Sequence, residues 1–129
     1  MRAFLALGLF GGSLLLAGCG EAGPPRYHVT GKVSFNSQPV PKGMIFFDPD
    51  VSQGNDGRQG FAFIENGLFD TRLDGQPQIG GPHLVRIQAF DGKPGNELPL
   101  GRQLAPELTT PVDFPKEESA HEFEVPKKK

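Results

Sequence analysis

Cys19, the only cysteine in the chain, is the residue with the most readily interpreted chemistry. A lone thiol cannot form a disulfide within the chain, and a free thiol is a reactive liability in an oxidising compartment. It follows an uncharged apolar run, residues 3–17, which comes after the basic residue Arg2. This arrangement is typical of a secretory signal, and the run is shorter than the roughly 20 residues of a membrane-spanning helix. We therefore predict an N-terminal signal helix over residues 1–18.

The residues at the end of that signal, Leu16, Ala17, Gly18 and Cys19, resemble the lipobox of bacterial lipoproteins. In that family the thiol takes up a diacylglyceryl group and the chain is cut before the cysteine. The resemblance implies that Cys19 is the lipid-attachment site, that residues 19–26 form a lipidated tether, and that covalent lipid holds the protein to a membrane. Because no Asp follows the cysteine, it also implies an outer-membrane anchor, in either leaflet. An ordinary secretory signal is the alternative, but it does not explain why the only cysteine follows Leu-Ala-Gly.

Three histidines, His28, His83 and His121, are the other candidates for metal or acid–base chemistry. A zinc site needs three or four ligands that are held by supporting hydrogen bonds. These histidines are far apart in the sequence, and each falls on an expected strand. The sequence therefore favours separate histidines on the surface or rim, and we expect no metal site there.

Two acidic segments, Asp-Pro-Asp at 48–50 and Asn-Asp-Gly at 55–57, contain the oxygen ligands that Ca²⁺ prefers. Their spacing departs from that of an EF-hand loop and the bidentate Glu is missing, whereas Asp, Asn and Gly are ordinary turn residues. The Gly-Gly-Pro-His segment at 80–83 precedes a strand rather than a helix, so it predicts a sharp bend and not a phosphate loop. No serine lies in a nucleophile motif. We therefore expect no calcium site, no cofactor and no enzymatic activity.

The composition limits the classes of partner. The 129 residues include 13 basic and 15 acidic ones, a net charge of −2, which does not favour nucleic-acid binding. Residues 127–129 are a short lysine tail, which we interpret as a solvated end. Trp is absent and Tyr27 is the only tyrosine, so little material exists for an aromatic sugar-binding platform.

Short strands and the turns between them are expected to position the histidines and the acidic segments. Apolar and polar residues alternate between turn signals, and no helical periodicity persists beyond residue 18. Asn66-Gly67 is a strong hairpin signal, and Pro111 places its strand at an edge or a bulge. We predict an all-β domain over residues 27–126, an antiparallel Greek-key β-sandwich of about seven strands. The expected strands are 27–35, 44–48, 61–64, 68–72, 83–90, 109–114 and 120–125.

The apolar phase of these strands predicts the core. The residues expected to be buried are Val33, Phe35, Phe46, Phe63, Val85, Ile87, Phe123 and Val125. The longest irregular segment, residues 91–108, contains three prolines and no strand periodicity. We expect it to be the most mobile part of the domain.

Four segments in order, VTGKVSFNSQPVPKGMIFFDPD, GFAFIENGLFDTR, GGPHLVRIQAFDG and HEFEVP, resemble the carboxypeptidase regulatory-like domains of the transthyretin-like (prealbumin-like) sandwiches. Together with the lipobox, they are similar to small lipoproteins of planctomycete-type bacteria. The resemblance implies a non-catalytic accessory or adhesive module. An enzymatic branch of that fold family relies on paired histidines, an arginine and a C-terminal Tyr-Arg-Gly-Ser. This chain ends in Pro-Lys-Lys-Lys, so that activity does not carry over.

These observations lead to two functional hypotheses. The first is a lipid-anchored, non-catalytic β-sandwich module of the cell envelope with a structural or protein-interaction role. The alternative is an envelope lipoprotein that captures a peptide or glycan through residues 91–108 or through a sheet edge. A concave pocket with polar groups would favour the ligand binder, and a flat apolar face would favour a protein partner.

Overall fold

A computed structural model describes residues 23–127 of the chain. The expected signal helix over residues 1–18, the Leu16–Cys19 motif and most of the lysine tail lie outside the described residues. Within the described part, the only helical element is one short 3-10 turn, η1, and no helix is long and apolar enough to cross a membrane. The prediction of an all-β domain is confirmed.

All seven expected strands are present, with ends that differ by a few residues, and two very short strands are added. The nine strands and η1 are β1 (Val29–Phe35), β2 (Gln38–Pro39), β3 (Lys42–Pro49), η1 (Val51–Gln53), β4 (Gly60–Glu65), β5 (Leu68–Asp70), β6 (Gly75–Gln76), β7 (Gly81–Phe90), β8 (Leu108–Phe114) and β9 (Ser119–Val125). The sequence did not predict β2 and β6 because two residues are too few to show alternation.

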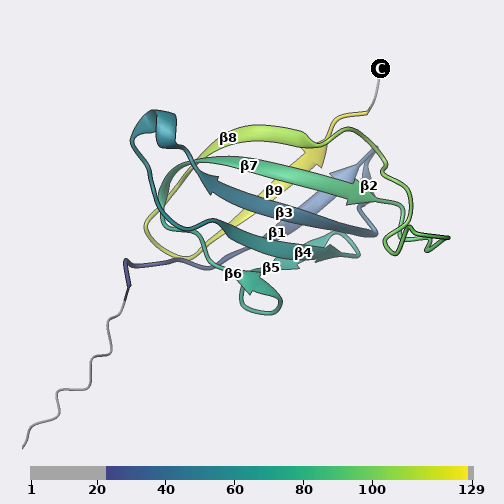
Figure 1. Cartoon of the computed structure of the whole chain (residues 1–129), viewed down its shortest axis with the longest axis horizontal. Coiled ribbons are helices and arrows are strands. Elements are labelled where there is room, and N and C mark those ends of the chain that lie inside the picture. The colour runs from purple at the N-terminus through teal and green to yellow at the C-terminus, as the bar shows by residue number, and fades with distance from the viewer. Residues whose placement is uncertain (1–22, 128–129) are drawn as a thin grey trace, which may run out of the picture.

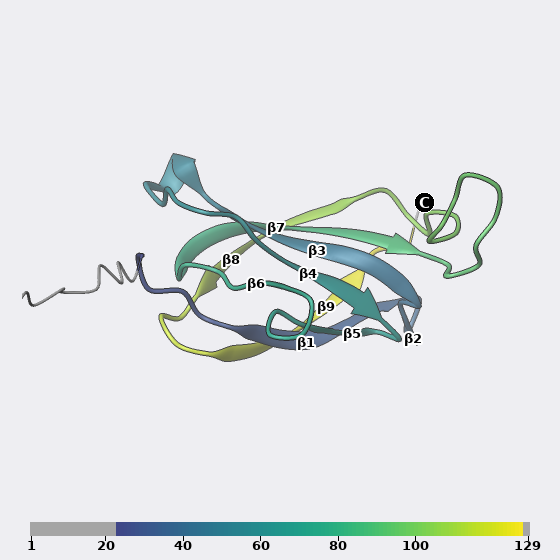
Figure 2. The same ribbon diagram turned by 60° about the horizontal axis from the view of Figure 1, so that its bottom comes forward.

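The strands form one curled sheet in the order β2-β1-β5-β4-β3-β7-β8. β6 pairs with β4, and β9 pairs with β1. Figures 1 and 2 show that the curl places β1 and β5 opposite β3 and β7, with the core between them. Every pairing is antiparallel except that of β9, which lies parallel to β1. β8 pairs only with β7, so Pro111 lies on an edge strand as expected.

Two tight turns set the register of the strands that they join. Asn66 and Gly67 have φ values of 50° and 77° and connect β4 to β5 through the pair Glu65↔Leu68. This confirms the predicted hairpin, because two positive φ values match the right-handed twist of the flanking strands. Asn36 and Ser37 repeat the geometry, with φ values of 51° and 61°, between β1 and β2.

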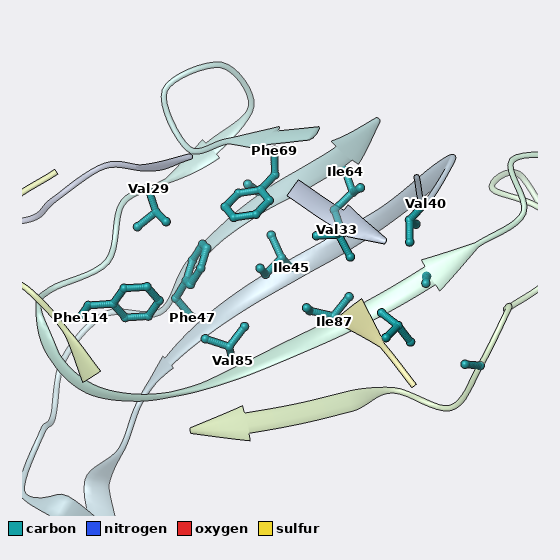
Figure 3. Close-up of a cluster of buried hydrophobic side chains, with 14 residues drawn as sticks. Val29, Val33, Val40, Ile45, Phe47, Ile64, Phe69, Val85, Ile87 and Phe114 are labelled. Atoms are coloured by element: carbon teal, nitrogen blue, oxygen red, sulfur yellow. The ribbon is translucent and has the colours of Figure 1, made fainter. Parts of the chain in front are cut away.

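The core lies between the two halves of the curled sheet (Figure 3). Val33, Val85, Ile87 and Val125 are buried as predicted. The other buried apolar residues are Val29, Val40, Ile45, Phe47, Ala62, Ile64, Phe69, Ala89, Ala105 and Phe114. Phe35 and Phe123 are only partly buried and pack against the edge of this cluster. The periodic positions of β1, β7 and β9 therefore predicted their inner faces correctly.

The predicted burial of Phe46 and Phe63 was wrong. Ile45 and Phe47 occupy the inner face of β3, so Phe46 lies on the outer face and is partly exposed. Phe63 is 46% exposed, between the buried Ala62 and Ile64. Residues 44–47 form an unbroken apolar run, which does not indicate which residues point inward.

Residues 91–108 are more closely attached to the domain than their sequence suggests. The Leu104 amide donates to the Ala89 carbonyl over 2.8 Å, and the Asp91 amide donates to the Arg102 carbonyl over 2.9 Å. Ala105 is buried in the core. The expected mobility stays a prediction, and the hydrogen bonds of residues 93–99 all stay within the segment.

Arg26, the last residue of the expected tether, is also attached to the domain. Its guanidinium donates to the Gln76 side chain over 3.1 Å and to the Pro77 carbonyl over 3.0 Å. The next residue, Tyr27, forms an isolated bridge with Gln78. Contacts between the chain and the sheet therefore begin at Arg26, the last residue of the expected tether.

Candidate binding groove

A groove of about 860 Å³ crosses the outer side of β1, β4, β5 and β9 and the loop that follows β5. Three apolar side chains line it with large exposed fractions: Phe63 at 46%, Leu68 at 56% and Leu73 at 78%. Among the described residues, only two other large apolar side chains, Val51 and Leu98, are comparably exposed, and both lie elsewhere. The groove therefore gathers three of the five exposed large apolar side chains of the described residues.

Ordinary strand geometry places Phe63 and Leu68 in the groove. Phe63 alternates with two inward-facing residues of β4, and Leu68 precedes the inward-facing Phe69 of β5. The two-residue turn at Asn66-Gly67 brings these strands side by side. The two apolar side chains consequently point to the same side of the sheet.

Hydrogen bonds at both ends of the β5–β6 loop hold Leu73 beside them. The Leu73 amide donates to the Asp70 carbonyl over 3.1 Å, and the Asp70 carboxylate accepts the Arg72 amide over 2.8 Å. The Phe63 amide donates to the Asp74 carbonyl over 3.4 Å. Figure 1 shows this loop next to β6, below β4 and β5.

Thr71 fastens the same loop to β1. It is buried, and its hydroxyl accepts the Val29 amide over 3.0 Å while its own amide donates to the Val29 carbonyl over 3.1 Å. His28 Nδ1 lies 3.0 Å from the same hydroxyl. His28, one of the histidines expected on the surface or rim, therefore contacts the residue that fastens the loop carrying Leu73.

Gly31 allows β1, β5 and β9 to come together beneath the groove. A Cβ at this position would lie 1.9 Å from the His121 carbonyl oxygen and 2.7 Å from the Phe69 ring. Real Cβ atoms do not approach other atoms so closely, so any other residue would push β9 or Phe69 away. Gly31 is thus required by close packing rather than by its backbone angles.

The charged side chains of the groove are mostly acidic. They are Lys32, Glu65, Asp70, Asp74 and Glu122. Glu65 forms an ion pair with Lys42, whose hydrogen bond and positive charge lower the pKa of that carboxyl. Within residues 23–127, no ion pair engages the other four side chains. Lys32 stands opposite Glu122 in the register of β1 and β9, and the charge of Asp70 acts on Arg72, whose pKa it helps to raise. Asp74 is therefore the groove carboxylate that none of these cations engages.

The expectation of surface histidines was wrong for His83, which is fully buried. Its Nδ1 donates to the Gly81 carbonyl over 2.8 Å, and its Nε2 has no hydrogen-bond partner. The rings of His83 and His121 both meet Phe114 edge-on, at centroid distances of 5.2 and 4.9 Å. Burial lowers the pKa of both imidazoles. The signal was present in the sequence, because His83 shares the alternation of Val85 and Ile87.

Ser119 and His121 form a contact between a nucleophile and a base, with Oγ 2.9 Å from Nε2. Catalysis by such a pair also needs a group that orients the imidazole through its other nitrogen. The hydrogen bonds of the described residues include none to His121 Nδ1. The pair is explained by the spacing of two residues along one strand, which places both side chains on the same face.

No three His, Cys, Asp or Glu side chains between residues 23 and 127 are grouped so that they could hold a metal ion. The acidic segments considered for Ca²⁺ have structural partners. Asp50 accepts the Ser52 amide and caps η1, and Asn55 donates to the Gly80 and Pro82 carbonyls. Gly80 and Gly81 have φ values of 77° and 81° and form the predicted sharp bend into β7.

The Asp48 carboxylate has two side-chain partners. Arg86 Nε lies 2.5 Å from it, and the side-chain Nε2 of Gln59 donates to it over 2.5 Å. Burial alone would raise the pKa of Asp48, but these hydrogen bonds and the positive charge of Arg86 outweigh it and lower the pKa.

A second hollow of about 290 Å³ lies at the base of the 91–108 segment, where Phe35, Pro39, Asp91 and Leu104 line it. It is about a third of the size of the groove, and none of the exposed large apolar side chains lines it. The alternative of ligand capture by residues 91–108 therefore has a smaller site, without exposed large apolar side chains.

Sequence reasoning missed the groove. It assigned Phe63 to the core and gave no role to Leu68 or Leu73. The alternation of β5, in which Leu68 and Asp70 flank the buried Phe69, was the only local signal. No family model matches the chain, and no curated protein matches it either.

Proposed function

We propose that this chain is a lipid-anchored, non-catalytic module of the cell envelope that binds a partner through the groove formed by β1, β4, β5 and β9. The observation that carries this proposal is the exposure of Phe63, Leu68 and Leu73 on one concave surface. Exposed apolar area is unfavourable in water, and its concentration in one patch is typical of interaction sites. The strands and the hydrogen-bonded loop hold the patch in place before a partner arrives.

We also propose that the domain is a Greek-key sandwich of the transthyretin-like type. The two facing halves of the curled sheet, the short strands and the core between them support this assignment. The connection from β8 to β9 supports it further, because these consecutive strands pair with β7 and β1 at separate parts of the sheet. The family resemblance of the four quoted segments adds the expectation of an accessory rather than a catalytic role.

The proposed anchor rests on the Leu16–Cys19 motif. Replacing Cys19 by Ala should block lipid transfer and leave an uncut precursor, because the peptidase of the lipoprotein family acts on the lipidated substrate. Mass spectrometry of the N-terminal peptide, together with fractionation of outer and inner membranes, measures both effects. An unmodified Cys19 in the processed native protein would contradict the anchor.

The groove is tested by photo-crosslinking in intact cells. A photoreactive amino acid placed at Phe63 or Leu73 should yield adducts of defined mass. The same substitution at Val51 or Leu98, which are exposed but outside the groove, should not. Adducts at Leu98 alone would favour the alternative of peptide or glycan capture by residues 91–108. Equal labelling at all four positions would contradict a specific site.

A further inference from the structure

We infer that the occupant of the groove is a polypeptide segment in which apolar side chains alternate with Lys or Arg. This inference rests on the groove function proposed above and adds the chemical class of the partner. It combines two features of the groove that come from different residues, an apolar surface and an unbalanced negative charge.

The apolar component comes from side chains of three different structural elements. Phe63 lies on β4, Leu68 on β5 and Leu73 in the loop that Thr71 fastens to β1. A partner that covers all three must present several apolar groups over an extended surface, because no single one of these side chains forms an enclosed pocket. Covering them removes apolar area from water, which drives association.

The charge component comes from the carboxylates around Leu73. Asp70 and Asp74 lie on either side of it in the sequence and line the same groove. Glu65 is already paired with Lys42, and Lys32 stands opposite Glu122 on the adjacent strand. Asp70 acts on Arg72, which leaves Asp74, and the lining as a whole has four carboxylates against one lysine. A cationic group on the partner would therefore meet an excess of negative charge. Such complementarity raises the association rate and selects the partner.

These two components favour a basic polypeptide over the other macromolecules of an envelope. An anionic lipid surface or a nucleic acid would be repelled by the carboxylates. A glycan would offer few apolar groups to the three exposed side chains. A basic apolar segment can cover the three exposed apolar side chains and also place positive charge beside the carboxylates.

The test uses the full-length lipidated protein in phosphatidylcholine nanodiscs and three fluorescein-labelled peptides. The probe is Lys-Phe-Lys-Leu-Lys-Leu, and its controls are Glu-Phe-Glu-Leu-Glu-Leu and Lys-Ser-Lys-Ser-Lys-Ser. Fluorescence anisotropy measures each Kd, and empty nanodiscs measure binding to lipid. We expect the first peptide to bind at least about tenfold more tightly than either control, because each control lacks one of the two components.

Two groove variants and two matched variants then locate the binding. Leu73→Ser and Asp74→Asn should each weaken binding of the basic apolar peptide, by about tenfold and about threefold. Leu98→Ser and Glu117→Gln, which make the same changes at exposed positions outside the groove, should leave its Kd unchanged. High salt should abolish the difference between Asp74→Asn and the unchanged protein but preserve the effect of Leu73→Ser.

Several results would overturn the inference. These are equal Kd values for the basic and acidic apolar peptides, no binding of any peptide at 1 mM, and binding that the groove variants leave unchanged. Concentration-dependent dimerisation that Leu73→Ser removes would identify a second copy as the occupant instead. Crosslinks at Leu73 in cells without a preference for the basic peptide would refute this partner class and leave the groove function standing. If crosslinks and peptide binding are both absent, both proposals fail.

Discussion

The outer face over β3 and β7 and the groove over β4 and β5 belong to one continuous sheet. They differ in how far their exposed side chains interact with other groups of the chain. On the first face, Arg86 donates to Asp48 over 2.5 Å and approaches Glu107 at 3.4 Å. Its guanidinium also lies 4.5 Å from the centre of the Phe46 ring. An exposed aromatic ring and three charged groups therefore satisfy one another within the chain.

The groove has no such internal network. Phe63 meets Phe61 edge-on at a centroid distance of 6.2 Å, but no cation covers it among the described residues. Asp70 and Asp74 have no ion-pair partner there. The comparison shows that exposure alone does not mark a binding surface. What distinguishes the groove is that its three exposed apolar side chains and the Asp74 carboxylate are not covered by a charged network such as that around Arg86.

The largest expected effect tests the core on which both faces rest. Phe47 lies between the rings of Phe69 and Phe114, at centroid distances of 6.1 and 5.5 Å. Phe47→Ala should lower the free energy of unfolding by about 3–5 kcal/mol, because it leaves a cavity where the two halves of the sheet meet. Its neighbour on the outer face gives the control, since Phe46→Ala should cost much less. Equal losses in urea denaturation would contradict the assigned faces of β3.

The next effect breaks the network of the β3–β7 face. Asp48→Ala removes the main partner of Arg86 and should lower the free energy of unfolding by about 1 kcal/mol, since both groups are roughly 30% exposed and partly screened. The double variant with Arg86→Ala should lose less than the sum of the two single changes. Additive losses would show that the pair does not interact in solution.

Acidification tests the core beneath β7 and β8. The unfolded pKa of a histidine is about 6.5, and burial lowers the folded pKa of His83 and His121. The unfolded state therefore binds protons first, so stability is complete above pH 6.5 and declines as the pH falls toward the folded values. Thermal unfolding between pH 7.5 and 5 measures this decline. His83→Phe should reduce it, and an undiminished decline in this variant would contradict the role of His83.

The smallest effect is expected in the groove. Leu73→Ser and Asp74→Asn should each change the free energy of unfolding by less than about 0.5 kcal/mol, because both side chains are exposed. If the same variants also bind the peptide more weakly, the groove side chains serve binding rather than the stability of the fold. A loss of stability as large as that of Asp48→Ala would remove the contrast between the two faces.

Much of the fold follows from local sequence. The alternation in β1, β7 and β9 predicted their inner faces, and Asn66-Gly67 predicted a hairpin because few residue pairs accept two positive φ values. Pro111 predicted an edge or a bulge, since a proline has no amide N–H for a second neighbour, and its strand lies at the edge. Each of these inferences needs only residues that are close together in the chain.

Tertiary structure decided the rest. In residues 44–47 every side chain is apolar, so the pairing of Ile45 with Ile87 and of Phe46 with Arg86 determines which side faces the core. The ring of the buried His83 packs edge-on against Phe114 of β8, and His121 of β9 packs against the same phenylalanine. The groove draws its lining from β1, β4, β5, β9 and a loop, and only the pairing of β1 with β5 and with β9 brings these distant segments together. Sequence alternation specifies the two faces of a strand, but the contacts made on folding decide which exposed side chains find partners.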